Sequence, residues 1–463
     1  MRHIILTALV SMAAAAPVAA QTADMPSWID AKTGHRVVRI TDAPGNYALY
    51  FNYNAYTPNG DTMLFQTAEG IKAMDLKTWR IRTVLKKPGV HLLFTGHKTR
   101  TAYFSRRNRD GVDVSSAIWA VDIDSGKVRK IADVPPGSRI DTINADETLL
   151  AAQIAERPME LQPGSKGRDP KTDQAAYAAN GPDGKPLPYA EAKEVRLDER
   201  LEAKIPMRIF TINVRTGEQR TVVQSTDWLN HLQFSPTDPT LLMYCHEGPW
   251  HKVDRIWTIR TDGTQKTKIH HRIMNMEIAG HEFWSPDGKT IWYDLQTPRG
   301  EDFWVAGYTI ATGKRRWYHL HRNQWSVHYN VSPDGKLFSG DGGDSEMVAH
   351  APDGKWIYLF HPHDIPDVAG IHAKNAADLI SPGTFTPEKL VDMSRQNYKL
   401  EPNARFSPDG RWLFFRANIE GKPAIYAVST EKRNSLADDK PQRSGEAGQA
   451  EQAGPINCPI FGR

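Results

Sequence analysis

The sequence predicts an all-β fold, a seven-bladed β-propeller built from four-stranded antiparallel blades. One observation is a turn of the form Ser/Thr-Pro-Asp/Asn-Gly, which recurs at residues 57–60, 285–288, 332–335 and 407–410. Each copy lies between two short apolar runs, a pattern typical of a β-hairpin. A second turn follows each hairpin, so that a unit of about 45 residues holds four strands, which is the period of a propeller blade.

The count of seven blades depends on weaker copies of the first turn. Degenerate copies lie at residues 144–147 and 235–238, and a less regular turn between two apolar runs lies at residues 96–99. Together with the clear copies these give seven units. A count of eight stays open, because residues 347–360 can be divided between strands in more than one way.

The amino-terminal residues predict export. Arg2 precedes an apolar run over residues 4–16, and small residues then provide a signal-peptidase site. We therefore expect a cleavable signal peptide over residues 1–20 and a periplasmic mature protein whose propeller spans residues 21–431. The segment 432–463, rich in Asp, Gln, Gly and Ser, is expected to form a flexible tail.

The composition excludes several classes of protein. The 463 residues include 58 Lys and Arg against 54 Asp and Glu, a formal net charge of +4, which is too balanced for a nucleic-acid binder that works through counterion release. After the signal peptide no apolar run reaches the roughly 18 residues that a membrane span needs, so no membrane insertion is expected. Two cysteines, Cys245 and Cys458, are too few for a disulfide scaffold or a Cys-rich zinc site. Whether they pair with each other stays open.

Two of the units are longer than the others. Residues 156–204 are expected between the second and third strands of the third blade, with a short helix over residues 190–205. Residues 361–401 are expected between the last strand of the sixth blade and the first strand of the seventh. Both kinds of connection leave a propeller on the face opposite the Pro-Asp-Gly turns. We therefore expect both insertions to flank a cleft; the alternative is that they clasp the rim or make an oligomer contact.

Histidines recur at an equivalent position of the first strands. Counting four residues back from the Ser or Thr of the turn gives Tyr53, His231, His281, His328 and Asn403. Because the first strand of each blade lines the central channel, these side chains should converge near its axis. Histidine is both a common transition-metal ligand and the usual proton shuttle near neutral pH. A metal site or a proton-transfer site is therefore expected there.

Polar loops are expected on the face where the histidines open. His246 and Trp250 follow the second strand of the fourth blade, Arg299 that of the fifth and Arg416 that of the seventh. Guanidinium groups around a histidine-lined pocket would suit the recognition of carboxylates. The alternative is that these arginines are solvated surface groups.

Four short strings carry a resemblance to a known family. They are Asn-His-Leu-Gln-Phe-Ser-Pro at residues 230–236, Cys-His-Glu-Gly-Pro-Trp-His at 245–251, Asp-Arg-Ile-Trp at 254–257 and Gly-His-Glu-Phe-Trp at 280–284. The chain resembles the oligogalacturonate lyases of polysaccharide lyase family 22 over most of residues 35–430. The resemblance implies a seven-bladed propeller that cleaves short acidic oligosaccharides of pectin by β-elimination. It also implies a divalent metal, typically Mn²⁺, bound by histidines and a glutamine.

The resemblance also implies roles for individual residues. His231 matches the family's base and His281 one of its metal ligands. The remaining ligands of the family, a Gln and two His, fall within residues 324–330, where His328 is the sole histidine of this chain. Gln324 or Asn330 would then complete the metal site. The residues expected to bind the substrate are His246, Trp250, Arg255, Arg299, Asn403 and Arg416.

The chemistry of β-elimination explains why a base and a cation are both needed. Removal of the weakly acidic C5 hydrogen of a uronate leaves negative charge on the adjoining carboxylate, which a metal or an arginine must stabilise. Two alternatives stay open. One is a noncatalytic periplasmic propeller that binds a partner, and the other is a lyase or hydrolase that acts on a different uronic-acid glycan.

Overall fold

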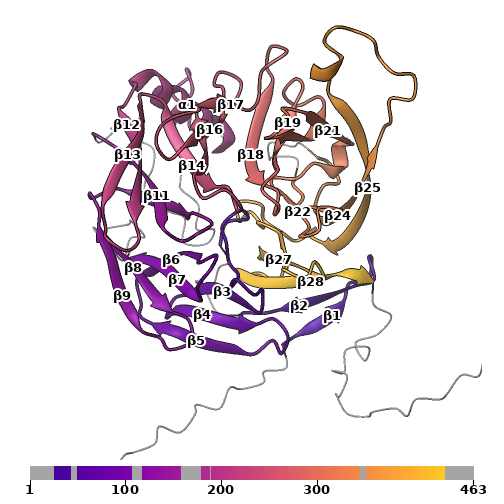
Figure 1. Cartoon of the computed structure of the whole chain (residues 1–463). Helices are drawn as coiled ribbons and strands as arrows, with labels where there is room; N and C mark the ends of the chain where they lie inside the picture. Colours follow the sequence, from indigo (N-terminus) through magenta and orange to yellow (C-terminus); the bar gives the residue numbers. More distant parts are fainter. Residues whose placement is uncertain are drawn as a thin grey trace, which may run out of the picture.

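The computed structural model describes residues 25–42, 49–106, 117–157, 179–187, 189–344 and 351–432 of the chain. The predicted signal peptide and the predicted tail beyond residue 432 lie outside these residues and stay predictions. Cys458 also lies outside them, so its pairing with Cys245 stays open. Within the described residues nearly all regular structure is β-strand, and the sheets are arranged around a central axis (Figure 1). This is the predicted all-β propeller arrangement.

The described strands form six hydrogen-bonded sheets. Three of the sheets have four strands each: β6 (Val90–Thr95), β7 (Thr101–Arg106), β8 (Ala117–Asp122) and β9 (Val128–Asp133); β10 (Arg139–Ile143), β11 (Leu149–Ala155), β12 (Met207–Asn213) and β13 (Gln219–Ser225); β14 (Trp228–Phe234), β15 (Leu241–Glu247), β16 (Ile256–Arg260) and β17 (Thr267–Lys268). A three-stranded sheet contains β3 (Thr62–Thr67), β4 (Gly70–Asp75) and β5 (Ile81–Lys86). An isolated bridge from Tyr56 to Met63 adds an inner edge to this sheet.

The fifth sheet has eight strands because two antiparallel sets are joined. The first set is β18 (Ile278–Trp284), β19 (Thr290–Gln296), β20 (Phe303–Thr309) and β21 (Arg315–Leu320), and the second is β22 (Tyr329–Val331), β23 (Phe338–Gly340), β24 (Trp356–Asp364) and β25 (Ser381–Asp392). β21 and β25 pair in parallel, from Arg316 opposite Ser381 to His319 opposite Thr384. Because one sheet is double, the number of blades stays a prediction.

The sixth sheet joins the two ends of the described chain. It contains β1 (Ser27–Ile29), β2 (His35–Arg39), β26 (Arg405–Phe406), β27 (Trp412–Ala417) and β28 (Ala424–Lys432). β2 pairs with β28 in an antiparallel register that places Val37 opposite Val428, and both of these side chains are fully buried. The ring is therefore closed by hydrogen bonds between segments that are far apart in the sequence.

The Pro-Asp-Gly turns form hairpins, as predicted. In the turn between β18 and β19 the Ser285 backbone N–H donates to the Thr290 carbonyl (2.8 Å), and the Ser285 hydroxyl donates to Asp287 Oδ1 (2.6 Å). Gly288 has a φ of 68°, which a residue with a Cβ adopts at a cost. The turn chemistry therefore sets where the first two strands of this set meet.

The first insertion lies where it was expected, between β11 and β12. Its described part includes the helix α1 (Tyr189–Ala203), close to the predicted bounds. α1 packs on the loop end of the β14–β17 sheet, where the Arg200 guanidinium lies 4.0 Å from the centre of the Trp228 ring and Lys252 pairs with Asp198 at 2.6 Å. Within the described residues, no helix has the length and apolar character needed to cross a membrane.

The expectation for residues 361–401 was wrong. β24 and β25 occupy much of this range and pair with each other, so the connection 365–380 joins the third and fourth strands of one set. It lies at the end that carries the hairpin turns, where Arg315 donates to the Asp378 carbonyl. The reason is that the turn at 352–354 lies before β24, whereas the prediction required the last strand of the sixth blade to end before residue 361. The loop 393–404 does return on the side of the histidines.

Candidate active site

Strained backbone directs two of the predicted histidines. The register of β14 shifts between Asn230 and Gln233, and that of β18 shifts between Gly280 and Phe283. His231 and His281 lie in these bulges with φ values of 48° and 44°, in the left-handed region that residues with a Cβ rarely adopt. Such strain is concentrated at functional sites in proteins.

The predicted convergence of the three histidines is observed. The rings of His281 and His328 lie 4.8 Å apart, centre to centre. The Tyr50 ring lies between the histidines, with its centre 6.1 Å from that of His231 and 5.2 Å from that of His328. The three first strands therefore contribute to one cluster, into which Tyr50 enters from the segment that precedes β3.

The donor set of His281 and His328 fits a metal ion. The Nδ1 atom of His281 lies 2.9 Å from Asp294 Oδ1, and that of His328 lies 2.8 Å from Asp341 Oδ2. Both carboxylates are buried. Metal-binding histidines commonly have one ring nitrogen held by a carboxylate while the other binds the ion. The Nε2 atoms of this pair are the nitrogens left for such a role.

Glu401 adds a carboxylate to this pair. Its Oε2 lies 3.8 Å from His328 Nε2, which also lies 3.2 Å from the Tyr50 hydroxyl. Burial alone would raise the pKa of Glu401, but the positive potential of His328 and Lys193 outweighs it and lowers the pKa. The cluster therefore offers two imidazoles and an ionised carboxylate, a ligand set that a divalent transition metal accepts.

The surroundings of His231 differ from those of the other two histidines. Its Nε2 lies 3.1 Å from Glu247 Oε2, and the other oxygen of Glu247 accepts from Arg255 Nη1 at 2.8 Å. Arg255 Nε also donates to Glu282 Oε2 at 3.0 Å. Cys245 is a buried free thiol, and its Sγ lies within 4.8 Å of the ligand atoms of His231 and Glu247. These three residues form a second group that could hold a metal.

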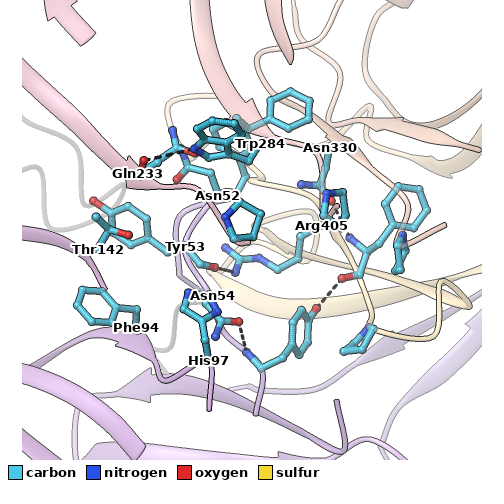
Figure 2. A pocket seen from close by; sticks show the side chains of 18 of the residues that line it. Asn52, Tyr53, Asn54, Phe94, His97, Thr142, Gln233, Trp284, Asn330 and Arg405 are labelled. Atoms are coloured by element: carbon cyan, nitrogen blue, oxygen red, sulfur yellow. Dashed lines mark hydrogen bonds between the residues drawn. The ribbon is translucent and has the colours of Figure 1, made fainter. Parts of the chain in front are cut away.

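Gln324 and Asn330 are not brought into the cluster by their observed contacts. Gln324 Oε1 accepts from the backbone N–H of His321 at 2.9 Å and so caps a short 3₁₀ turn. Asn330 Oδ1 accepts from the backbone N–H of Phe406 at 3.3 Å. Asn330 also lines a cavity of about 580 Å³ among the prolines of the hairpin turns, at the opposite end of the axis (Figure 2).

Three of the predicted substrate-binding residues have internal partners. Arg255 is buried between two carboxylates, as described above. Asn403 donates its backbone N–H to Asp341 Oδ2 at 3.0 Å, and Arg416 Nε donates to the Glu401 carbonyl at 2.7 Å. These residues stabilise the walls of the cluster in the structure. Their contact with a substrate stays a prediction.

Two of the other three predicted substrate-binding residues, Trp250 and Arg299, contact α1. Lys193 of α1 lies 5.2 Å from the centre of the Trp250 ring, and Arg299 pairs with Glu194 of the same helix. His246 Nε2 lies 3.5 Å from Asp227 Oδ1, and burial lowers the pKa of His246. α1 therefore contacts two of the loops that the sequence placed on this face, those that carry Trp250 and Arg299.

Sequence reasoning missed Tyr50, Lys193, Glu247, Glu401 and the two aspartates that hold His281 and His328. One signal for the aspartates was available. Gly280 pairs with Asp294, and the pair Tyr329 and Gly340 places His328 beside Asp341. Aligning the two strands of each hairpin in the sequence would therefore have predicted an aspartate on the second strand next to His281 and to His328. Glu401 and Lys193 come from a loop and an inserted helix, for which no such register exists.

Comparison with known proteins identifies the family. A sequence model described as oligogalacturonate lyase matches residues 183–433, which is more than half of the chain. The chain belongs to the oligogalacturonate lyase family. The resemblance inferred from the sequence strings is therefore confirmed.

Curated members of the oligogalacturonate lyase family match part of the chain. The oligogalacturonide lyase of Pectobacterium atrosepticum is 28% identical over 220 residues, which cover 47% of this chain and 54% of that protein. The oligogalacturonate lyase of Dickeya dadantii is 27% identical over 226 residues, with the same two coverages. The chain thus spans about half the length of the curated relatives that it matches.

Solved structures of the oligogalacturonate lyase family share the fold over most of the chain. An oligogalacturonate lyase in complex with manganese superposes with a TM-score of 0.66 at 23% identity, covering 88% of this chain and 96% of that one. The oligogalacturonate lyase from Vibrio parahaemolyticus gives a TM-score of 0.66 at 20% identity, covering 88% and 97%. At these identities the likeness establishes the fold.

Proposed function

We propose that this protein is an exported lyase that cleaves short galacturonate-type oligosaccharides by β-elimination with the help of a divalent metal. The observation that carries the proposal is the division of the cluster. His231 and His328 both lie against the Tyr50 ring, and His231 and the His281–His328 pair have separate buried carboxylate partners. Membership of the oligogalacturonate lyase family supports the reaction class. The predicted signal peptide supports a periplasmic location.

The metal would be held by His281 Nε2, His328 Nε2 and Glu401. When bound, it would supply positive charge to the substrate carboxylate that becomes more negative as the C5 proton leaves. Mn²⁺ accepts imidazole and carboxylate ligands, and a related family member is known in complex with manganese. Glu401 therefore takes the place that the sequence analysis gave to Gln324 or Asn330.

The chain's own residues perform the proton transfer. His231 accepts the C5 proton, the C4–C5 double bond forms, and the bond from C4 to the glycosidic oxygen breaks. The departing oxygen takes up a proton from solvent. The charge of Lys193 contributes to the lowered pKa of both Glu247 and Glu401. Lys193 is therefore the cation of α1 best placed to meet a substrate carboxylate.

Incubation of the purified full chain with galacturonate oligosaccharides and Mn²⁺ tests the reaction. We expect ultraviolet absorbance of the conjugated double bond to rise, and to stop rising when a chelator is added. New reducing ends without that absorbance would indicate hydrolysis, and neither signal would indicate a noncatalytic binding propeller. Either result overturns the proposal.

The His231→Ala variant tests the identity of the base. Turnover should fall by about 10²- to 10⁴-fold, the usual contribution of a general base, while Mn²⁺ stoichiometry stays at the wild-type value. Parallel loss of the metal would make His231 a ligand and reassign the roles.

Amino-terminal sequencing of the mature protein isolated from the periplasm tests the predicted export. The first residue should be Gln21 if the signal peptide is cleaved as predicted.

A further inference from the structure

The carboxylate partners of the three histidines do not contact the same ring nitrogen. His281 and His328 have Nδ1 against a carboxylate, at 2.9 Å and 2.8 Å. His231 instead has Nε2 against Glu247, at 3.1 Å. A carboxylate contact selects the tautomer that carries its proton on the contacted nitrogen. The free lone pair is therefore on Nε2 in the first two histidines and on Nδ1 in His231.

Glu247 is fixed by buried contacts on both of its oxygens. Arg255 bridges it to Glu282, and the side chains of Arg255, Glu247 and Glu282 are exposed by only 4%, 9% and 1%. Burial alone would raise the pKa of Glu247, but Arg255 and His231 outweigh it and hold the pKa well below its usual range. The carboxylate that contacts His231 is thus ionised and immobile.

We propose that Glu247 is a positioning residue for the base, because it accepts a hydrogen bond from Nε2–H of His231 and leaves the Nδ1 lone pair to receive the C5 proton. Arg255 acts one step further out, where it orients Glu247 and links it to the strand of the metal-binding His281. This gives the buried Arg255 a role other than the substrate contact expected from the sequence. The inference deepens the proposed function and rests on His231 being the base.

Nitrogen NMR of the full chain labelled in its histidines tests the tautomer directly. The sample contains Mg²⁺ in place of Mn²⁺ so that the metal is diamagnetic, and the His231 signals are assigned by their loss in His231→Gln. We expect a protonated Nε2 and an unprotonated Nδ1 in the wild type. In Glu247→Ala the two nitrogens should shift toward the averaged values of a tautomer mixture. In Glu247→Gln the single amide oxygen faces the obligate donor Arg255, so the amide NH2 donates to Nε2 and the proton should move to Nδ1.

Kinetics supply the second readout. Glu247→Ala should lower kcat by about 10- to 100-fold, the scale of a misaligned catalytic group, with KM changed by less than about threefold. Glu247→Gln, which moves the ring proton to Nδ1, should lower kcat at least as much. Glu388→Ala is the matched control, since it removes a carboxylate 3.2 Å from Nε2 of the buried His35 elsewhere in the ring. It should leave the His231 signals and kcat unchanged.

Several results would overturn the inference. A wild-type spectrum with the proton on Nδ1 contradicts it, as does a folded Glu247→Ala variant with unchanged ring signals and kcat. Loss of Mn²⁺ stoichiometry in Glu247→Gln would make Glu247 a metal ligand together with His231 and Cys245. If the Ala variant does not fold, the wild-type and Gln spectra still decide. If the wild type has no lyase activity, the proposed function fails while the NMR result stands on its own.

Discussion

Asp341 is the residue whose removal should damage the cluster most. Its carboxylate accepts three hydrogen bonds, from the His328 backbone N–H at 2.8 Å, from His328 Nδ1 at 2.8 Å and from the Asn403 backbone N–H at 3.0 Å. The side chain of Asp341 is fully buried. It therefore joins the segment before β22, the loop after β23 and the loop before β26 through one group.

The cost of Asp341→Ala follows from these contacts. Two buried backbone N–H groups lose their acceptor at about 1 to 3 kcal/mol each, and the imidazole loses another hydrogen bond. Some of the vacated space can take up water, which offsets part of the loss. We expect the free energy of unfolding to fall by roughly 3 to 5 kcal/mol.

Urea unfolding followed by tryptophan fluorescence measures this change. The matched control is Asp334→Ala in the hairpin turn of the same strand set, where an exposed carboxylate accepts from Ser332 and Lys336; it should cost about 1 kcal/mol or less. Because Asp341 also fixes the His328 ring, Mn²⁺ affinity of Asp341→Ala should fall by about 10- to 100-fold. An unfolding free energy within about 1 kcal/mol of the wild type, matching the control, would refute the reasoning.

Three further predictions address the metal, the substrate and the pH dependence. Glu401→Gln should weaken Mn²⁺ binding at least about tenfold in competition with a chelator, whereas Asn330→Ala should leave it unchanged; the reverse order would restore the ligand set expected from the sequence. Lys193→Ala should raise KM for acidic oligosaccharides severalfold at low salt with kcat preserved, and the difference should shrink as salt screens the charge; an equal effect at high salt would contradict this. The pKa of Glu247 is lower in the folded protein than in the unfolded chain, where it is about 4.3. The ionised carboxylate therefore stabilises the fold fully above pH values of about 4.3, and this stabilisation is lost as the pH falls toward the folded-state pKa. Wild-type stability should therefore drop more steeply than that of Glu247→Gln from about pH 5 to pH 3, and parallel curves from urea unfolding would exclude this.

The fold could be predicted from local chemistry because the repeating turns are local. The Ser-Pro-Asp-Gly sequence needs no distant partner to form its turn, so the hairpins are where the sequence indicated. The turn at residues 352–354 shows the limit of this argument. It has the same composition but lies before β24, and the pairing of β24 with β25 extends from Trp356 opposite Asp392 to Asp364 opposite Gly383. Such long-range pairing is not encoded in a turn.

The site was predictable to the extent that it repeats. His231, His281 and His328 were found because each has the same offset from its turn. Asn330 is two residues from His328, and in a regular strand both side chains would share a face. However, β22 begins at Tyr329, so His328 lies outside the regular alternation, and Asn330 faces the cavity at the other end of the axis.

The difference between the proposed base and the proposed metal ligand His281 coincides with a difference at one position of the repeated strand pair. Asp294 pairs with the residue before His281, and Cys245 occupies the same register position relative to His231. Burial raises the pKa of the Cys245 thiol, so it offers no negative charge to the His231 ring. The charge comes instead from Glu247, two residues further along β15 and therefore on the same face of the strand. Because it approaches from there, it contacts Nε2 at 3.1 Å, and His231 differs from its two neighbours in the ring nitrogen that stays free.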